Sequence, residues 1–251
     1  MSRFQFEQDC EVRDIALLYG VVAGDHFPLP RCAALIQDAD SHDEVVDLSI
    51  YCGLDRRYEE YFGIDFWKIF AKPSLNEFAA LPVEVRGIFR RTLISCYKNR
   101  RIPQVCFLTE YTNHLPMDTR EYVNFYGSEH HALLSAYLRG EEMPDNIRTS
   151  PAYYNGCPSS LIVSEKPVQR PHGITRDANN NLHFGPTQKL DFEMEVGFYI
   201  SKPVPRGRRV PLEDAIQHIF GFVLLNDWTA RDMEDYERKP LGPSQSKGAV
   251  V

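Results

Sequence analysis

Residues 190–196 constrain this chain most, because acidic and apolar residues alternate along them with a period of two. Alternate side chains of a strand point to the same face, so Asp191, Glu193 and Glu195 are expected on one face and apolar residues on the other. Neighbouring carboxylates repel one another unless they are solvated, protonated or bound to a cation. The pattern predicts a strand and leaves two interpretations open: a solvated edge or part of a divalent-cation site.

A second segment, residues 222–232, is an apolar run that ends in Asn-Asp-Trp. We interpret residues 220–226 as a buried strand with Asp227 at its tip. An acid in this place is often functional, although it also caps turns. Two such strands side by side would supply carboxylate oxygens for Mg²⁺ or Ca²⁺, so a divalent-metal site is the first hypothesis.

Composition is that of a globular protein with a real core: 251 residues, of which 43% are hydrophobic and 25% charged. The net charge of −7 argues against a nucleic-acid or anionic-membrane partner. No apolar run approaches the roughly 18 residues that span a bilayer, and residues 1–7 are too polar for a signal peptide. The six cysteines form no C-x-x-C pair. We therefore expect a cytoplasmic protein with reduced thiols.

The first hundred residues are expected to form a small separate unit. Residues 31–37 and 44–53 are β-prone runs joined by a polar stretch, which predicts a hairpin. Ser74 and Glu77 have the spacing of a capping box at a helix start. Pro82 suits the first turn of a second helix.

That second helix has an apolar stripe and a basic end. The stripe consists of Val85, Ile88, Phe89 and Leu93. The basic end, residues 97–103, could bind a phosphate or a nucleic acid, but cations favour helix C-termini, which favours a solvated helix end.

A second unit is expected from about residue 105. Its predicted elements are a helix at 132–138, a short strand at 160–164, a polar turn region at 177–185 and a helix at 212–219. His130 and His131 precede the first of these helices. An imidazole there could act as a base near neutral pH, or the pair could be structural. Lys247 is by default a surface lysine.

Five motifs occur in order along the chain: residues 124–126 with His131, 151–160, 190–195, 218–232 and 240–243. Together they resemble the fumarylacetoacetase (fumarylacetoacetate hydrolase) family. The resemblance covers nearly the whole chain, and residues 218–232 carry its longest motif. It implies a mainly β fold with some helix (α+β). A small SH3-like β-barrel domain at 1–112 would precede a β-sandwich or roll hydrolase domain at 113–251, ending before the family's C-terminal part.

The resemblance also implies a chemistry, the metal-dependent hydrolysis of a carbon–carbon bond of fumarylacetoacetate to fumarate and acetoacetate in tyrosine and phenylalanine degradation. It implies Mg²⁺ or Ca²⁺ as cofactor, a small diketo acid as substrate and a homodimer. The implied catalytic residues are His131 as general base, Lys247 and Arg231. The implied metal ligands are Glu193, Glu195 and Asp227 with Asn124 in the fourth position, which leaves Asp191 out. The implied substrate-binding residues are Tyr126, Arg139, Tyr154, Glu234 and Arg238.

Several residues depart from the family pattern. Asn124 replaces the fourth metal carboxylate, Glu234 replaces a glutamine and Arg238 replaces a tyrosine. Asn155 and Cys157 replace a histidine and an arginine around Gly156. Two alternatives therefore stay open: a catalytically impaired, truncated relative, and a decarboxylase, isomerase or other acylpyruvase of the superfamily.

Overall fold

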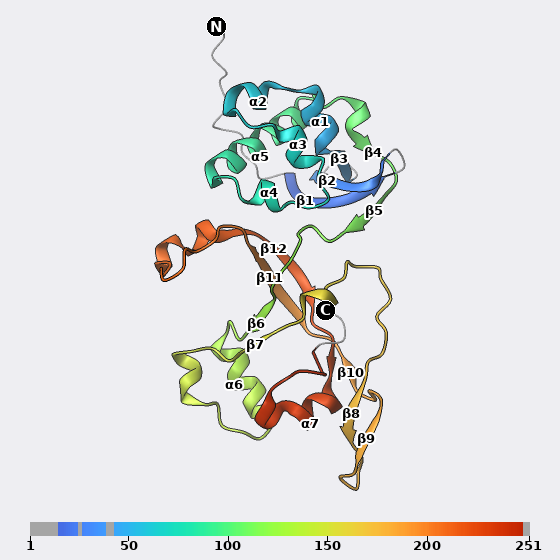
Figure 1. The fold of residues 1–251 in the computed structure, drawn as a ribbon, viewed down its shortest axis with the longest axis vertical. Helices are drawn as coiled ribbons and strands as arrows, with labels where there is room; N and C mark the ends of the chain where they lie inside the picture. The colour runs from blue at the N-terminus through green and yellow to red at the C-terminus, as the bar shows by residue number, and fades with distance from the viewer. Residues whose placement is uncertain (1–14, 25–26, 39–42, 248–251) are drawn as a thin grey trace. The chain divides into compact units, whose positions relative to one another are not determined.

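The computed structural model describes residues 15–24, 27–38 and 43–247. The expectations for residues 1–7, for Cys10 and for residues 39–42 and 248–251 lie outside the described residues. The chain divides into two compact units (Figure 1): Met1–Asp118 with Phe198–Phe222, and Thr119–Gly197 with Val223–Val251. Within the described part, no helix is long and apolar enough to cross a membrane.

An antiparallel sheet organises the first unit. Its described strands are β1 (Ile15–Gly24), β2 (Phe27–Asp38), β3 (Glu44–Asp47), β4 (Phe107–Leu108) and β5 (Tyr111–His114), in the order β4-β3-β2-β1-β5. A register shift between Val22 and Gly24 interrupts the β1–β2 ladder, and such irregularities bend a sheet. The predicted hairpin is confirmed as β2–β3. The expected SH3-like barrel is not confirmed, because β4 and β5 are edges of this order.

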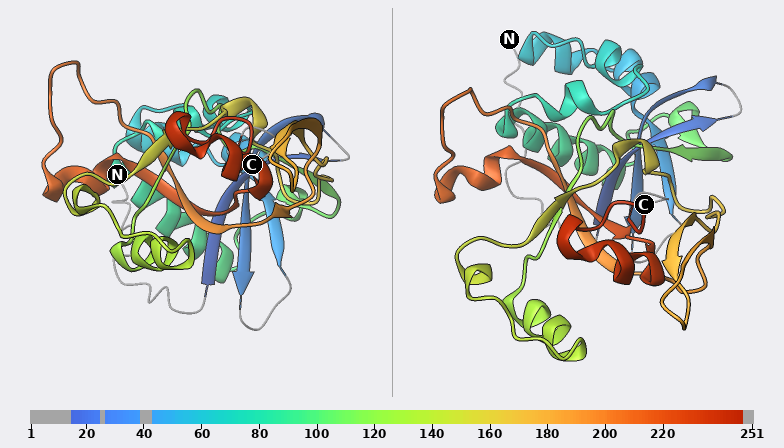
Figure 2. Two further views of the ribbon diagram at one scale, coloured as in Figure 1. Left: turned by 90° about the horizontal axis from the view of Figure 1, so that it is seen from below. Right: turned by 60° about the horizontal axis from the view of Figure 1, so that its bottom comes forward.

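Helices cover one face of this sheet (Figures 1 and 2). They are α1 (Leu48–Leu54), α2 (Arg57–Phe62), α3 (Phe66–Phe70), α4 (Asn76–Ala79) and α5 (Val83–Lys98), and the 3-10 helix η2 (Gln104–Cys106) precedes β4. The rings of Phe66, Phe70, Phe78 and Phe89 pack at centroid distances of 4.9 to 5.9 Å. This aromatic cluster is the centre of the unit's core.

Local signals explain where these helices begin. The strand expected over residues 44–53 is wrong beyond Asp47, because the Asp47 carboxylate accepts from the amides of Ser49 and Ile50 and starts α1. The capping box is also wrong, since α4 begins after Leu75 without a side-chain cap.

The prediction for α5 is confirmed, because the helix starts directly after Pro82 and buries Phe89 and Leu93. The basic residues after this helix terminate it. The amide of Arg101 donates to the carbonyl of Cys96, and the intervening Arg100 has a φ of 53°. The side chains of Arg100 and Arg101 are exposed, as expected of a solvated helix terminus.

Short strand pairs and two longer helices make up the second unit. The pairs are β6 (Val123–Phe125) with β7 (Tyr153–Asn155), β8 (His172–Arg176) with β9 (Leu182–Pro186) and β10 (Leu190–Asp191) with β13 (Thr229–Ala230). Strand β11 (Met194–Ile200) pairs with β12 (Ile219–Asn226), and residues 194–197 and 223–226 of this pair belong to the second unit. The helices are α6 (Glu129–Leu138) and α7 (Arg231–Leu241), with 3-10 turns η3 (Asp145–Arg148) and η4 (Pro158–Ser160). A further 3-10 helix, η5 (Leu212–His218), belongs to the first unit and directly precedes β12.

Three sequence predictions are corrected here. No strand forms at residues 160–164, where η4 ends and irregular backbone follows. The polar turn region 177–185 contains most of β9, which pairs with β8. The helix predicted at 212–219 is the 3-10 helix η5.

The acidic segment and the apolar run also differ from expectation. The acidic strand is interrupted at Phe192 and Glu193, between β10 and β11. Strand β12 is not buried, because alternate residues face outward, with Leu224 80% exposed. On β11 the apolar side chains are the exposed ones, and Met194 is 78% exposed. The acidic side chains are therefore on the more sheltered face, the reverse of a solvated acidic edge.

Candidate metal centre

The interruption between β10 and β11 brings three carboxylates together. Glu193 lies in the interruption, Glu195 lies two residues later on β11, and Asp227 directly follows β12. The amide of Asp227 donates to the carbonyl of Glu193 at 2.9 Å, which ties the two segments together. One carboxylate oxygen from each residue lies within 4.8 Å of the others. This triad is the oxygen-rich arrangement that the alternating pattern predicted as one of its two outcomes.

Strands β6 and β7 add two polar side chains to the triad. Asn124 and Tyr154 are direct partners in the β6–β7 register, so both reach the same place. The Asn124 amide Nδ2 donates to Glu195 Oε2 at 2.8 Å and to Asp227 Oδ2 at 3.1 Å. The Tyr154 hydroxyl donates to Asp227 Oδ2 at 2.6 Å. Both predicted site residues therefore contact the carboxylates directly.

Lys247 is a buried member of the same cluster, so its interpretation as a surface lysine is wrong. Its Nζ lies 2.8 Å from Glu193 Oε2 and 2.9 Å from Asp227 Oδ2. It also donates to Thr229 Oγ1 at 2.5 Å. The ammonium group offsets part of the negative charge that the three carboxylates concentrate.

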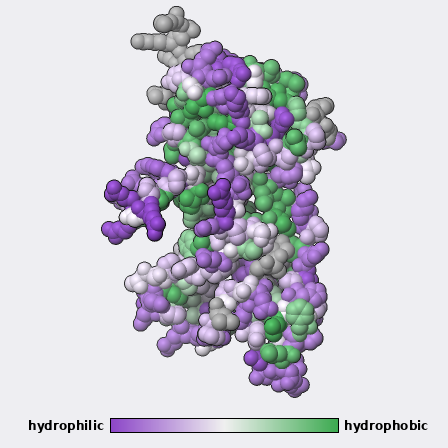
Figure 3. Space-filling view, in the orientation of Figure 1, coloured by the Kyte–Doolittle hydropathy of each residue, from purple (hydrophilic) through white to green (hydrophobic). Residues whose placement is uncertain are grey.

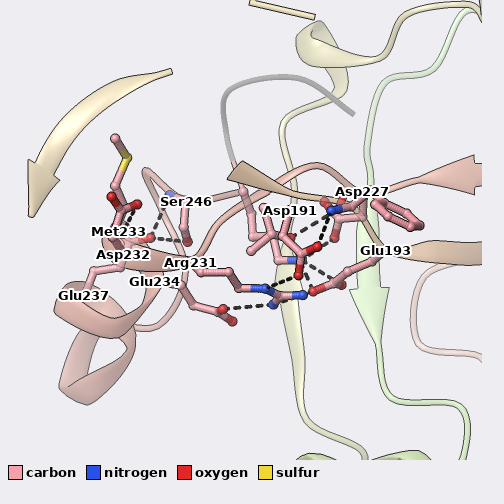
Figure 4. A network of polar contacts seen from close by, with 12 residues as sticks. Asp191, Glu193, Asp227, Arg231, Asp232, Met233, Glu234, Glu237 and Ser246 are labelled. Atoms are coloured by element: carbon pink, nitrogen blue, oxygen red, sulfur yellow. Dashed lines mark hydrogen bonds and ion pairs between the residues drawn. The ribbon is translucent and has the colours of Figure 1, made fainter. Parts of the chain in front are cut away.

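Arg231, at the start of α7, forms ion pairs with acids of the segment 191–193 (Figure 4). Its guanidinium contacts Asp191 at 3.0 Å, Glu193 at 2.7 Å and Glu234 at 3.0 Å. Asp191 is thus bound to Arg231 and is not part of the triad, although it shares the alternating pattern. Glu234 is a partner of Arg231 in the same network.

The surroundings shift the pKa values of these groups in opposite directions. Burial opposes ionisation of Glu193, but Lys247 and Arg231 outweigh burial and lower its pKa. The pKa of Glu195 is raised by burial and by repulsion from Asp227 and Glu193, despite its bond from Asn124. Burial also opposes the charge of Lys247, yet Asp227 and Glu193 raise its pKa. The surroundings therefore favour the ionised form of Glu193 and disfavour that of Glu195.

A divalent cation fits this set of side chains. Asp227 is fully buried, and its Oδ1 has no hydrogen-bond partner among the described residues. A buried carboxylate oxygen without a partner is costly, and a cation would satisfy it. Carboxylate oxygens are the ligands that hard cations such as Mg²⁺ and Ca²⁺ prefer. Glu193, Glu195 and Asp227 are the residues that would hold such an ion.

Two residues of this network were not predicted from the sequence. Tyr122 is the first: its hydroxyl accepts from Asn124 Nδ2 at 3.4 Å, and burial raises its pKa to about 12. Its carbonyl accepts from the amide of Gly156, where a Cβ would overlap the Tyr122 ring. Thr229, between Lys247 and Glu193, is the second. Neither stands out by residue type, because only the strand pairing brings them to the site.

The remaining predicted residues form two further groups. His131 is an exposed residue in the first turn of α6, where Ser128 caps its amide, and its ring lies 5.2 Å from that of Tyr126. His131 thus belongs to the helix rather than preceding it. Arg139 and Arg238 both bind the carboxylate of Glu141. Hydrogen bonds from Lys239, Arg139 and Arg238 lower the pKa of Glu141 to about 2.

Residues 122–250 match the model of the family described as "Fumarylacetoacetate (FAA) hydrolase C-terminal". The chain belongs to the fumarylacetoacetate hydrolase family. The matched region contains the triad, Asn124, Tyr154, Arg231 and Lys247. The resemblance that the five motifs indicated is therefore confirmed, and the family is one of hydrolases.

Curated relatives agree with this membership. The chain is 36% identical to a fumarylacetoacetase of Aspergillus fumigatus over 71% of its length and 46% of the relative's. It is 34% identical to the fumarylacetoacetase of Bos taurus and 32% identical to that of Homo sapiens, in each case over 98% of its length and 60% of the relative's. The chain thus spans about half of the relatives it matches.

A solved fumarylacetoacetate hydrolase from Exiguobacterium antarcticum is similar in structure. The similarity has a TM-score of 0.47 at 17% identity and covers 94% of this chain and 62% of that one.

Proposed function

We propose that this chain hydrolyses a carbon–carbon bond of a 1,3-diketo acid, and that its substrate is fumarylacetoacetate. The observation that supports this is the cluster itself, in which three carboxylates and Lys247 converge and one buried oxygen of Asp227 has no partner. Such a site can hold a cation and stabilise developing negative charge at the same place. The proposal includes Mg²⁺ or Ca²⁺ as the ion, a homodimer and the cytoplasm. It also includes a division into an N-terminal domain at 1–112 and a catalytic domain at 113–251.

In the proposed hydrolysis, His131 is the base, and Lys247 and Arg231 supply positive charge. His131 takes a proton from water as the water oxygen bonds to the carbonyl carbon of the substrate. The carbon–carbon bond then breaks, its electron pair leaves with the acetoacetate fragment as an enolate, and His131 returns the proton to carbon. Lys247 and Arg231 stabilise the enolate oxygen with their positive charge. A divalent cation, if held by Glu193, Glu195 and Asp227, would add Lewis-acid stabilisation of this charge.

Substrate orientation is assigned to the residues around this centre. Tyr126 lies beside His131, so a carbonyl group bound by its hydroxyl would be held near the base. Tyr154 contacts Asp227 and would hold the substrate against the triad. Arg139 and Arg238 are assigned to the carboxylates of the substrate. Glu234 would repel a carboxylate, so its part in substrate binding is to orient Arg231.

A second candidate function is a relative with little or no turnover. Two observations favour it: Asn124 brings an amide where the family resemblance implies a carboxylate, and Glu234 pairs with Arg231 and neutralises part of its charge. A decarboxylase or isomerase of the same superfamily would share the triad but would not need His131 as the base for water.

The test is cleavage of fumarylacetoacetate by the purified chain, with and without added Mg²⁺ or Ca²⁺. We expect cation-dependent turnover that is abolished in His131→Ala, and thermal stabilisation by the cation that is lost in Glu195→Ala. The absence of turnover in a folded chain that still binds the cation would support the impaired relative. The absence of any cation effect on the unaltered chain would overturn the metal site.

A further inference from the structure

The segment that carries Lys247 is held by one buried carboxylate. Glu237, in the last helical turn before the kink of α7 at Lys239, is 4% exposed. Its Oε1 accepts from the amides of Ser244 and Ser246 at 2.7 and 2.8 Å, and its Oε2 accepts from the amide of Gln245 at 2.8 Å. The hydroxyl of Ser246 adds a fourth bond at 2.5 Å (Figure 4). Three consecutive backbone amides therefore point at a single side chain.

The position of Glu237 is unfavourable without these bonds. Negative charge near a helix C-terminus opposes the helix dipole, and burial opposes the ionised form. The bonds from residues 244–246 outweigh that burial and lower the pKa of Glu237. The carboxylate and the loop thus stabilise each other, and bonds to a charged acceptor are among the stronger ones.

The same loop delivers Lys247 to the triad. Ser246 is also joined to β13, because the amide of Ala230 donates to its carbonyl at 3.1 Å. The next residue, Lys247, then reaches Glu193 and Asp227. A lysine has a long flexible stem, so the place of its ammonium group depends on where its backbone is held.

We propose that Glu237 is a positioning residue, which fixes Lys247 against Glu193 and Asp227 by binding the amides of residues 244–246. Its catalytic consequence rests on the proposed function, in which Lys247 stabilises the enolate. Glu237 acts only through the loop and contacts neither the substrate nor the triad. Glutamine at this position presents an NH₂ group that cannot accept an amide hydrogen, so Glu237→Gln loses part of the clamp without changing side-chain size.

The first test measures Lys247 directly and does not require activity. The unaltered chain and Glu237→Gln are treated with a limiting amine-acylating reagent, and each lysine's modification rate is read by mass spectrometry. We expect Lys247 to react about tenfold faster in Glu237→Gln while the other lysines keep their rates. Asp235→Asn is the matched control, since Asp235 is an exposed acid on the same helix. Its Lys247 rate should equal that of the unaltered chain.

The second test separates positioning from general structure by kinetics. Lys247 acts on charge that develops during bond cleavage, so Glu237→Gln should lower kcat about tenfold and leave KM unchanged. When Glu237→Gln is combined with Lys247→Met, kcat should fall no further than in Lys247→Met alone, because the lysine that Glu237 positions is already absent.

Each failure has a distinct meaning. If the unaltered chain has no turnover, the proposed function fails, and the acylation rates still decide the role of Glu237. An unchanged Lys247 rate in Glu237→Gln, or a uniform rise at all lysines, would overturn the positioning role. If Glu237→Gln does not fold, Ser246→Ala decides instead. It removes only the hydroxyl bond, and an unchanged Lys247 rate there would equally overturn the proposal.

Discussion

At the scale of single residues, the centre is a balance between three acids and the groups that offset them. Lys247 is within 2.9 Å of both Glu193 and Asp227, whereas Glu195 receives its bond from the neutral amide of Asn124. The charge compensation is therefore uneven. Glu195 and Asn124 are the positions at which a substitution should report on a bound cation most directly.

Asn124→Asp should strengthen cation binding and weaken the cation-free fold. The new carboxylate cannot donate to Glu195 and Asp227, and it repels them. We expect a loss of about 1–3 kcal/mol in the free energy of unfolding without divalent ions. Added Mg²⁺ should raise the thermal midpoint more than in the unaltered chain. Asn113→Asp, at an exposed strand position, is the control that should change neither quantity.

Glu195→Gln should change how stability depends on pH when chelator is present. The pKa of Glu195 is raised in the folded state, so its favourable contribution is complete below the unfolded pKa of ~4.3 and is lost as pH rises through the folded pKa. Glutamine does not ionise and still accepts the bond from Asn124. The variant should therefore gain stability relative to the unaltered chain as the pH rises above about 4.

The measurement is chemical denaturation at a series of pH values. Glu213→Gln, at an exposed acid of η5, is the matched control. Its free energy of unfolding should differ from that of the unaltered chain by the same amount at every pH. A pH-independent difference in the free energy of unfolding for Glu195→Gln as well would contradict the raised pKa of Glu195.

At the scale of elements, short strand pairs place the site. The β6–β7 register sets Asn124 opposite Tyr154, and the interruption after β10 lets Glu193 approach Asp227. Gly156, just after β7, allows the Tyr122 ring to lie against the backbone. The geometry of the centre thus depends on backbone features some distance along the chain from the acids.

Gly156→Ala should disturb the β6–β7 pair, because the added Cβ would overlap the Tyr122 ring. We expect a loss of about 1–3 kcal/mol in the free energy of unfolding, typical of overpacking, together with a weaker thermal shift from Mg²⁺. Gly20→Ala is the control, since a Cβ there meets nothing within 4 Å. Equal stability of the two variants would contradict the tight Tyr122–Gly156 contact.

At the scale of the whole molecule, apolar side chains lie on the surface of a chain that spans about half of its relatives (Figure 3). Met194, Val196 and Leu224 of β11 and β12 are exposed. Exposed apolar groups of this extent promote association between molecules.

Met194→Lys together with Leu224→Glu should reduce self-association without loss of stability. Both side chains are about four-fifths exposed, so they contribute little to the core. Light scattering across a concentration series should show a smaller average mass than for the unaltered chain, with thermal midpoints within experimental error. Thr112→Lys with Asn113→Glu, an exposed pair on β5, should leave the average mass unchanged.

The sequence was sufficient where a local pattern meets a strong physical preference. Pro82 and the stripe through Phe89 and Leu93 predict α5, because helix starts and apolar periodicity are local properties. The motif around Asp227 predicts the family, and the family model matches that region. It was insufficient at residues 44–53, where a buried Asp47 cap converts a β-prone run into a helix after four residues.

Sequence alone determined which acids are candidates for a cation and left open whether their face is solvated. Only the tertiary structure decided that Glu193, Glu195 and Asp227 converge, that Asp191 binds Arg231, and that Lys247 is buried among them. The reason is that alternation along a strand specifies a face but not what covers it. Convergence arises from pairing between distant segments, from an interruption between β10 and β11, and from a loop held by Glu237. The strand pairing and the loop contact join residues outside any one motif, so a motif read by itself does not predict them.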